Sequence, residues 1–97
     1  MQLVGDIGGT NARFAWLDEA GDPYTPMTLP VRDYATIGDA MRDFMARTNC
    51  TDLREFAVAV ACPAMADTVK FTNNPWVFSK EALKAEFNLD RLVVVND

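Results

Sequence analysis

The sequence predicts a mixed α/β fold that opens with a β-hairpin. Two strand-like runs, residues 2–6 and 12–18, stand on either side of a turn rich in glycine. Apolar residues between positions 37 and 45 then recur at the spacing of one helix face. The last seven residues, RLVVVND (91–97), form an apolar run that is typical of a buried, parallel strand.

The hairpin and one further strand account for the first third of the chain. The turn at residues 7–11 joins two strands, and the second strand places Phe14 and Trp16 on one face and Arg13 on the other. A third strand is expected at residues 27–32. It should lie at an edge of the sheet, because prolines stand within and just before it.

A first helix is expected to begin after Thr36, which is a good N-cap residue. Asn49 is a plausible stop at its other end. The apolar stripe that would face the core consists of Ile37, Ala40, Met41, Phe44 and Met45.

The remaining elements alternate between strand and helix. Residues 55–61 are expected to form a strand, and residues 68–71 a second, short one. A second helix should begin at Ser79 and end near Asn88. The terminal strand at 91–97 follows directly.

Composition limits the kinds of protein that this chain can be. Its 97 residues are enough for one core but not for two, and 49% hydrophobic with 24% charged residues is ordinary for a globular domain. The net charge is −5 and the basic residues are scattered, which argues against a nucleic-acid partner. No apolar run is long enough to span a bilayer. Two cysteines, Cys50 and Cys62, fit reduced thiols, so we expect a cytoplasmic protein.

The absence of histidine narrows the chemistry further. A Ser-His-Asp triad, a Cys-His dyad and a histidine-ligated metal are all excluded within these 97 residues. Any reaction must therefore depend on carboxylates, amides, hydroxyls or the backbone.

The glycine-rich turn can be compared with known phosphate-binding loops. It lacks the Gly-Lys-Ser/Thr ending of a Walker A loop, and it is followed by a strand where the dinucleotide fingerprint requires a helix. A hairpin turn remains, whose amides could hold a phosphate together with Thr10 and Asn11, while Asp6 could hold a hydrated Mg²⁺. The alternative is that Gly8-Gly9 is only a tight turn.

Three of the expected strands end in polar or unusual residues. These are Asp6, Cys62-Pro63 and Asn96-Asp97. If the strands are parallel neighbours, Asp6 and Asp97 should face one cleft at the carboxyl edge of the sheet. Other marked residues have plainer interpretations. Asn73-Asn74-Pro75 should form a turn, and Trp76, Phe78 and Cys62 should lie in the core.

Three blocks of the sequence resemble a known family. VGDIGGTNARFA (4–15), AVACPAMADTVKFTNNPWVFS (59–79) and LVVVND (92–97) are similar, in this order, to the N-terminal lobe of bacterial glucokinases. These enzymes belong to the superfamily of sugar kinases, Hsp70 and actin. The resemblance implies an actin-like ATPase (ribonuclease H-like) lobe, with a mixed sheet that opens with a β-hairpin and is flanked by helices. It also implies that residues 1–97 are the first part of a longer, two-lobed enzyme.

The resemblance further implies transfer of a phosphoryl group from ATP to the 6-hydroxyl of glucose, in glycolysis. Asp6 would position Mg²⁺ or its water, Asn96 would bind sugar hydroxyls, and Asp97 would bind the sugar and act as the catalytic base. The residues matched to the nucleotide-binding segment are Gly5, Asp6, Ile7, Gly8, Gly9 and Thr10.

Several expectations follow for the protein as a whole. The full-length enzyme should be a cytoplasmic homodimer, and the 97 residues alone should be inactive because they hold only one lobe. A kinase for another hexose and a repressor-type sugar-binding relative are the alternatives. The hairpin begins at residue 2, which leaves no room for a preceding DNA-binding helix-turn-helix. An actin-like assembly or chaperone module is a third alternative, but it would have no need for the sugar-contacting residues that the resemblance implies in the TNNPW (72–76) and terminal ND blocks. The hexose preference and the choice between ATP and polyphosphate stay open.

Overall fold

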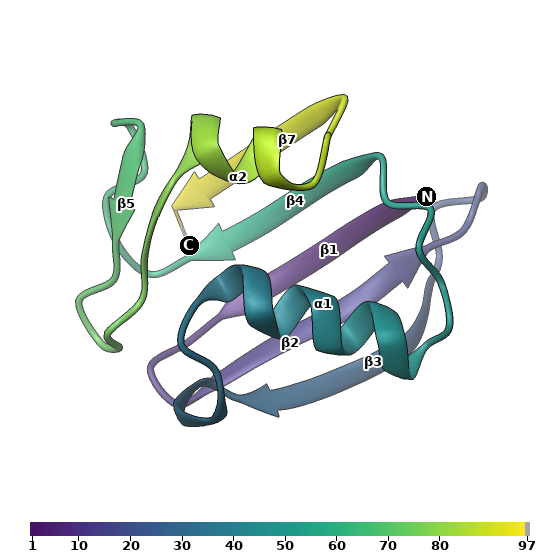
Figure 1. Ribbon diagram of the computed structural model, residues 1–97, viewed down its shortest axis with the longest axis horizontal. Helices are drawn as coiled ribbons and strands as arrows, with labels where there is room; N and C mark the ends of the chain where they lie inside the picture. The colour runs from purple at the N-terminus through teal and green to yellow at the C-terminus, as the bar shows by residue number, and fades with distance from the viewer. Residues whose placement is uncertain (97) are drawn as a thin grey trace.

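A five-stranded mixed sheet with both helices on one of its faces forms the body of the chain (Figure 1). The structure, a computed structural model, describes residues 1–96. A separate two-stranded sheet of β5 and β6 lies beyond one end of the large sheet. The elements are β1 (Gln2–Ile7), β2 (Asn11–Leu17), β3 (Pro23–Pro30), the 3₁₀ turn η1 (Val31–Asp33), α1 (Ile37–Arg47), β4 (Glu55–Val60), β5 (Thr68–Lys70), β6 (Val77–Ser79), α2 (Lys80–Glu86) and β7 (Arg91–Asn96).

The large sheet has the strand order β3-β2-β1-β4-β7. β1 and β2 form the expected antiparallel hairpin, and β1, β4 and β7 run parallel. Ile7 is opposite Val60 and Val60 is opposite Asn96, so the three parallel strands end level with one another. The prediction that their carboxyl ends share one edge is therefore confirmed.

The core lies between the sheet and the helices. Phe44 of α1 packs against Phe14 and Trp16 of β2, with ring centroids 5.7 Å away in both cases. All three side chains are at most 1% exposed, and full burial of a side chain of this size contributes about 1.5–3 kcal/mol to stability. The predicted apolar stripe of α1 is buried except for Met45, which is half-buried because it lies at the margin of the stripe.

The helix ends follow the local signals in the sequence. The Thr36 hydroxyl accepts a hydrogen bond from the Asp39 amide at 3.1 Å, and Ser79 caps α2 in the same way through the Ala82 amide. Asn49 and Asn88 follow the two helices with φ angles of 53° and 52°. Asparagine tolerates this left-handed conformation, which ends a helix.

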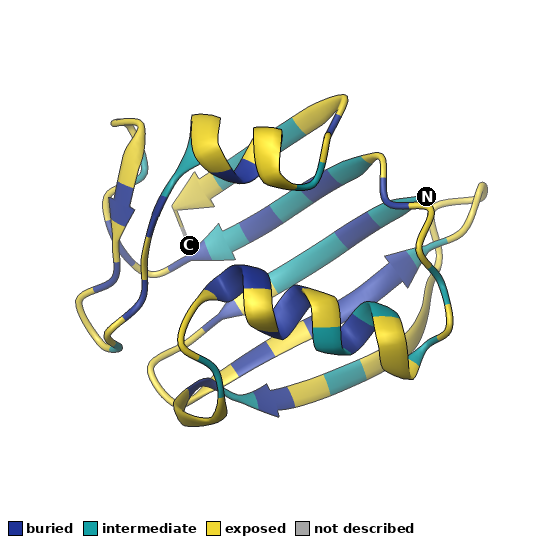
Figure 2. Cartoon of the chain, in the orientation of Figure 1, coloured by how far each residue is buried: buried dark blue, intermediate teal, exposed yellow. Residues whose placement is uncertain are grey.

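The sheet has one face covered by the helices and one open face (Figure 2). Burial alternates along β4 because its side chains point to the two faces in turn. No helix among residues 1–96 lies on the open face. The small apolar side chains that this open face carries are Val4, Ala15, Ala57, Ala59, Val93 and Val95.

Several elements differ from the sequence-based expectation. The strand expected at residues 27–32 is β3 (Pro23–Pro30), which begins and ends earlier because it pairs with β2, and residues 31–33 form η1. β7 is parallel as predicted, but its apolar residues are only half-buried and Val95 is 50% exposed. The reason is that β7 is an edge strand with a neighbour on one side only. β6 was not predicted at all, because its three residues become a strand only by pairing with β5.

Candidate phosphate-binding site

The β1–β2 turn, residues 8–10, is the candidate site. The Gly8 amide donates to the Asn11 carbonyl at 2.9 Å and closes the turn. Neither Gly8 nor Gly9 has a positive φ angle. A left-handed backbone is therefore not the reason for the glycine pair, and the space around each residue is the other property that can require glycine.

The nearby glycines meet different steric demands. A Cβ on Gly5 would lie 3.2–3.3 Å from the rings of Phe14 and Phe56, so Gly5 is needed for core packing. A Cβ on Gly9 would lie 3.0 Å from the Cβ and carbonyl oxygen of Asn73. On Gly8 it would meet only the Asn11 carbonyl oxygen, at an ordinary 3.5 Å. Nothing among residues 1–96 requires a glycine at position 8.

Two of the three carbonyl groups in the β1–β2 turn, those of Gly8 and Thr10, accept hydrogen bonds from other segments of the protein. The Asn74 side-chain amide donates to the Gly8 oxygen at 2.9 Å, and the Val31 amide donates to the Thr10 oxygen at 2.9 Å. Within the described residues, the amides of Gly9 and Thr10 donate to no protein acceptor. Adjacent free amides in a turn form a concave donor site that suits an anion.

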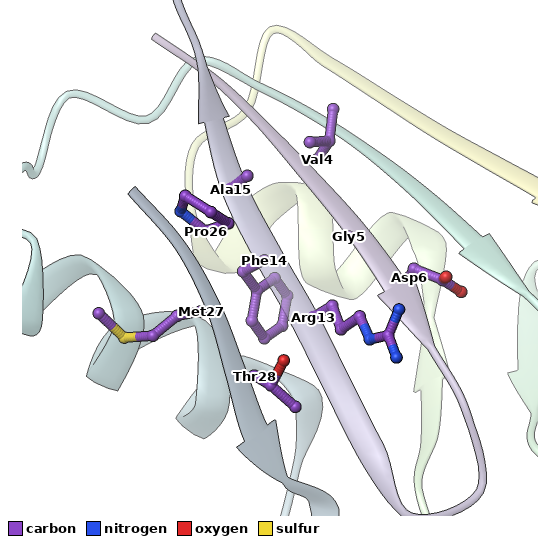
Figure 3. Close-up of a pocket in the computed structure, with 9 residues that line it drawn as sticks. All are labelled: Val4, Gly5, Asp6, Arg13, Phe14, Ala15, Pro26, Met27 and Thr28. Atoms are coloured by element: carbon purple, nitrogen blue, oxygen red, sulfur yellow. The ribbon is translucent and has the colours of Figure 1, made fainter. Parts of the chain in front are cut away.

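A polar hollow of about 290 Å³ adjoins the turn. Asp6 and Arg13 line it and are direct partners across the β1–β2 pair, on the open face of the sheet (Figure 3). Both are exposed. The hollow therefore combines backbone donors, a guanidinium group that suits a phosphate and a carboxylate that suits a cation. The sequence placed Arg13 on this face of its strand but did not connect it with the site.

The donor set can be compared with what a Mg²⁺ ion needs. Residues 1–96 contain no cluster of three or more carboxylate, thiol or imidazole groups that could enclose a metal. Asp6 is thus a single carboxylate beside a phosphate-sized donor site. Mg²⁺ usually keeps several waters and binds through one or two carboxylates plus substrate phosphates, so Asp6 fits this role.

The other predicted site residue in the described part of the chain, Asn96, ends β7 at the same edge of the sheet as the turn. β1 and β7 are separated by β4, and therefore by about 10 Å. The strand register places Asn96 on the helix-covered face and Asp6 on the open face. Asp97, the predicted catalytic base, lies outside the described residues, so its position relative to Asp6 stays a prediction.

The three residues that the sequence assigned to the core are buried in the structure. Trp76 and Phe78 are buried, and so is Cys62. Burial raises the pKa of the Cys62 thiol, which keeps it neutral and unreactive. Asn74 was also expected to be structural, as part of a turn, but its side chain binds the Gly8 carbonyl, 66 positions away in the sequence. The sequence predicted a turn there and the resemblance implied sugar contacts, but no local pattern could have revealed the contact with Gly8.

The fold is found in sugar kinases of known structure. A crystal structure of a glucokinase from an Antarctic psychrotroph superposes with a TM-score of 0.80 at 34% identity, over 99% of this chain and 32% of that one. A putative N-acetylmannosamine kinase from Listeria monocytogenes has a TM-score of 0.69 at 23% identity, which supports the fold alone. The chain therefore has the actin-like fold of these kinases.

Sequence comparison narrows this class to one family. The family model described as "Glucokinase" matches residues 3–97. A curated glucokinase of Hahella chejuensis is 44% identical over 98% of this chain, and one of Neisseria meningitidis is 41% identical over 99%. The chain belongs to the glucokinase family. It spans about 30% of the length of these curated relatives. Within residues 1–96, neither helix has the length and apolar character needed to cross a membrane.

Proposed function

We propose that this chain is the N-terminal lobe of a glucokinase and binds the phosphates of ATP in the β1–β2 turn. The observation that carries the proposal is the turn itself. Asn74 and Val31 hold its Gly8 and Thr10 carbonyls, while the amides of Gly9 and Thr10 have no acceptor among residues 1–96. Membership of the glucokinase family supports the same function.

The nucleotide side of the reaction falls to β1 and β2. The free amides hold a phosphate of ATP, and Arg13 offsets part of its negative charge. Asp6 would hold Mg²⁺ directly or through a water, and the ion would supply positive charge beside the phosphates. Gly5 and Ile7 belong to the same segment, but their side-chain positions face the core.

The sugar side falls to the end of β7. Asn96 binds a hydroxyl of glucose, and Asp97 accepts the proton of the 6-hydroxyl as its oxygen attacks the γ-phosphorus of ATP. The bond from the γ-phosphorus to the bridging oxygen breaks, and ADP and glucose 6-phosphate are the products. We further propose that the complete enzyme is a cytoplasmic homodimer that serves glycolysis.

The test uses a complete enzyme in which residues 1–97 replace the segment of the Hahella chejuensis glucokinase that they match. We expect this chimera to phosphorylate glucose with ATP and Mg²⁺, and to use other hexoses less well. The 97 residues alone should show no activity, because they span only about 30% of such an enzyme. A folded chimera that binds neither ATP nor glucose would overturn the proposal.

A further inference from the structure

We propose that Asn74 is the positioning residue that directs the Gly9 amide toward the bound phosphate. This inference rests on the proposed phosphate-binding function of the β1–β2 turn. It assigns a role to the 72–76 loop, in which the sequence predicted a turn at residues 73–75 and the family resemblance implied contacts with the sugar.

Asn74 joins two segments that are far apart in the sequence. Its side-chain Nδ2 donates to the Gly8 carbonyl oxygen at 2.9 Å, and its Oδ1 accepts from the Trp76 amide at 2.8 Å. The Gly8 carbonyl can only accept and the Trp76 amide can only donate. The Asn74 side chain must therefore point its Nδ2 at Gly8 and its Oδ1 at Trp76. The side chain is thus oriented from both ends.

The hydrogen bond from Asn74 to the Gly8 carbonyl also sets the direction of the Gly9 N–H. The Gly8 carbonyl and the Gly9 N–H belong to one planar peptide, and no described peptide bond is cis. In a trans peptide the oxygen and the hydrogen point in opposite directions. By holding the Gly8 oxygen on the side of the 72–76 loop, Asn74 therefore turns the Gly9 N–H away from that loop.

The 72–76 loop that carries Asn74 is itself anchored to the core. Trp76 is 1% exposed, and its indole Nε1 donates to the Tyr34 carbonyl at 3.0 Å. On the other side, the loop lies close to Gly9: a Cβ added to Gly9 would be 3.0 Å from the Cβ and the carbonyl oxygen of Asn73. Glycine at position 9 is what allows the loop to approach the turn, and this approach brings Asn74 within reach of Gly8.

Loss of this hydrogen bond should affect phosphate binding more than folding. Gly8 is exposed, so water can replace the Asn74 donor at its carbonyl. The peptide plane would then be free to rotate, and ATP would have to bind the fraction of turns with the correct orientation. A net effect typical of one hydrogen bond predicts a loss of affinity of about three- to tenfold.

The experiment compares Asn74→Ala and Asn74→Asp with Asn73→Ala and Asn73→Asp in the chimera described above. Asn73→Ala keeps the Cβ that contacts Gly9, and Asn73→Asp places the same new charge one position away. We expect both Asn74 variants to raise KM for ATP about three- to tenfold above their Asn73 counterparts, with KM for glucose unchanged. In crystals of nucleotide-free Asn74→Ala, the Gly8–Gly9 peptide should be rotated or adopt two orientations.

Three results would overturn the inference. They are equal KM values for ATP in the Asn74 and Asn73 variants, a parallel rise in both KM values with a lowered Tm, and an unchanged Gly8–Gly9 peptide in Asn74→Ala. If the unmodified chimera fails to bind ATP, the proposed function is wrong, and the orientation of the Gly8–Gly9 peptide still decides the role of Asn74.

Discussion

Single residues in the β1–β2 hairpin show how one short motif serves several purposes. Gly5 makes room for Phe14 and Phe56, and Gly9 makes room for Asn73. Gly8 faces neither constraint, and we propose that it allows a phosphate to approach the turn. The sequence offered two interpretations of the glycine pair, a phosphate-binding turn and a plain tight turn. It did not separate these reasons, because each depends on residues that fold against the turn from elsewhere.

Gly8→Ala and Gly9→Ala should therefore differ in their effect on the stability of the fold. We expect Gly8→Ala to change the free energy of unfolding by no more than about 1 kcal/mol, because its Cβ meets an ordinary contact and φ is not positive. Gly9→Ala should destabilise by about 1–3 kcal/mol through overpacking against Asn73. Gly8→Ala should nevertheless weaken ATP binding. Urea unfolding and KM for ATP in the chimera measure both, and wild-type ATP binding by Gly8→Ala would contradict the site.

Asp97 can be tested as the base without knowledge of its position. In the complete enzyme, Asp97→Asn should lower kcat about 10²-fold or more, because the amide cannot accept the proton of the sugar hydroxyl. KM for ATP should change little. Steady-state kinetics at saturating glucose provide the measurement. An Asp97→Asn enzyme with near-normal kcat would assign the proton transfer to another group.

At the scale of elements, α2 depends on a cap from outside the helix. The Asp67 carboxylate accepts from the Ser79 hydroxyl at 2.6 Å and from the Glu81 amide at 3.0 Å. These two hydrogen bonds lower the pKa of Asp67 below its usual value. The helix has only seven residues, which is too short to be stable without such support.

This cap predicts a pH dependence of stability. Because the pKa of Asp67 is lower in the folded chain, its contribution is complete above the unfolded pKa of about 3.9. The contribution is lost as the pH falls from there through the lower, folded pKa. Urea midpoints measured in the chimera across this range should fall less steeply for Asp67→Asn than for the unmodified protein. Equal slopes would show that the cap does not depend on the charge.

Elements whose limits depend on nearby residues were predicted well. Thr36 and Ser79 cap their helices, and Asn49 and Asn88 end them, as expected. β6 was missed because it exists only through its pairing with β5. The burial of β7 was overestimated, since apolar residues on both faces indicate what a strand can bury and not which neighbours it has.

At the scale of the whole molecule, the open face and the β7 edge expose apolar surface together. Val95 is 50% exposed at an edge that can pair with another strand. We therefore expect the 97-residue chain to self-associate, and Val95→Lys to reduce this. Val77→Lys is the matched control, because Val77 is also exposed, at 53%, but lies in the small sheet. Sedimentation that shows a clean monomer of the unmodified chain at high concentration would contradict the expectation.

The sequence by itself determined the family, the hairpin, the approximate helix limits and the parallel character of the last strand. These features depend on motifs and on interactions within a few residues, which a linear pattern preserves. Only the tertiary structure showed that β1, β4 and β7 end level, that Arg13 lies beside Asp6, and that Asn74 holds the Gly8 carbonyl. The physical reason is that strand register and contacts across 66 positions are decided by packing of the whole sheet and its loops, and no local segment contains that information.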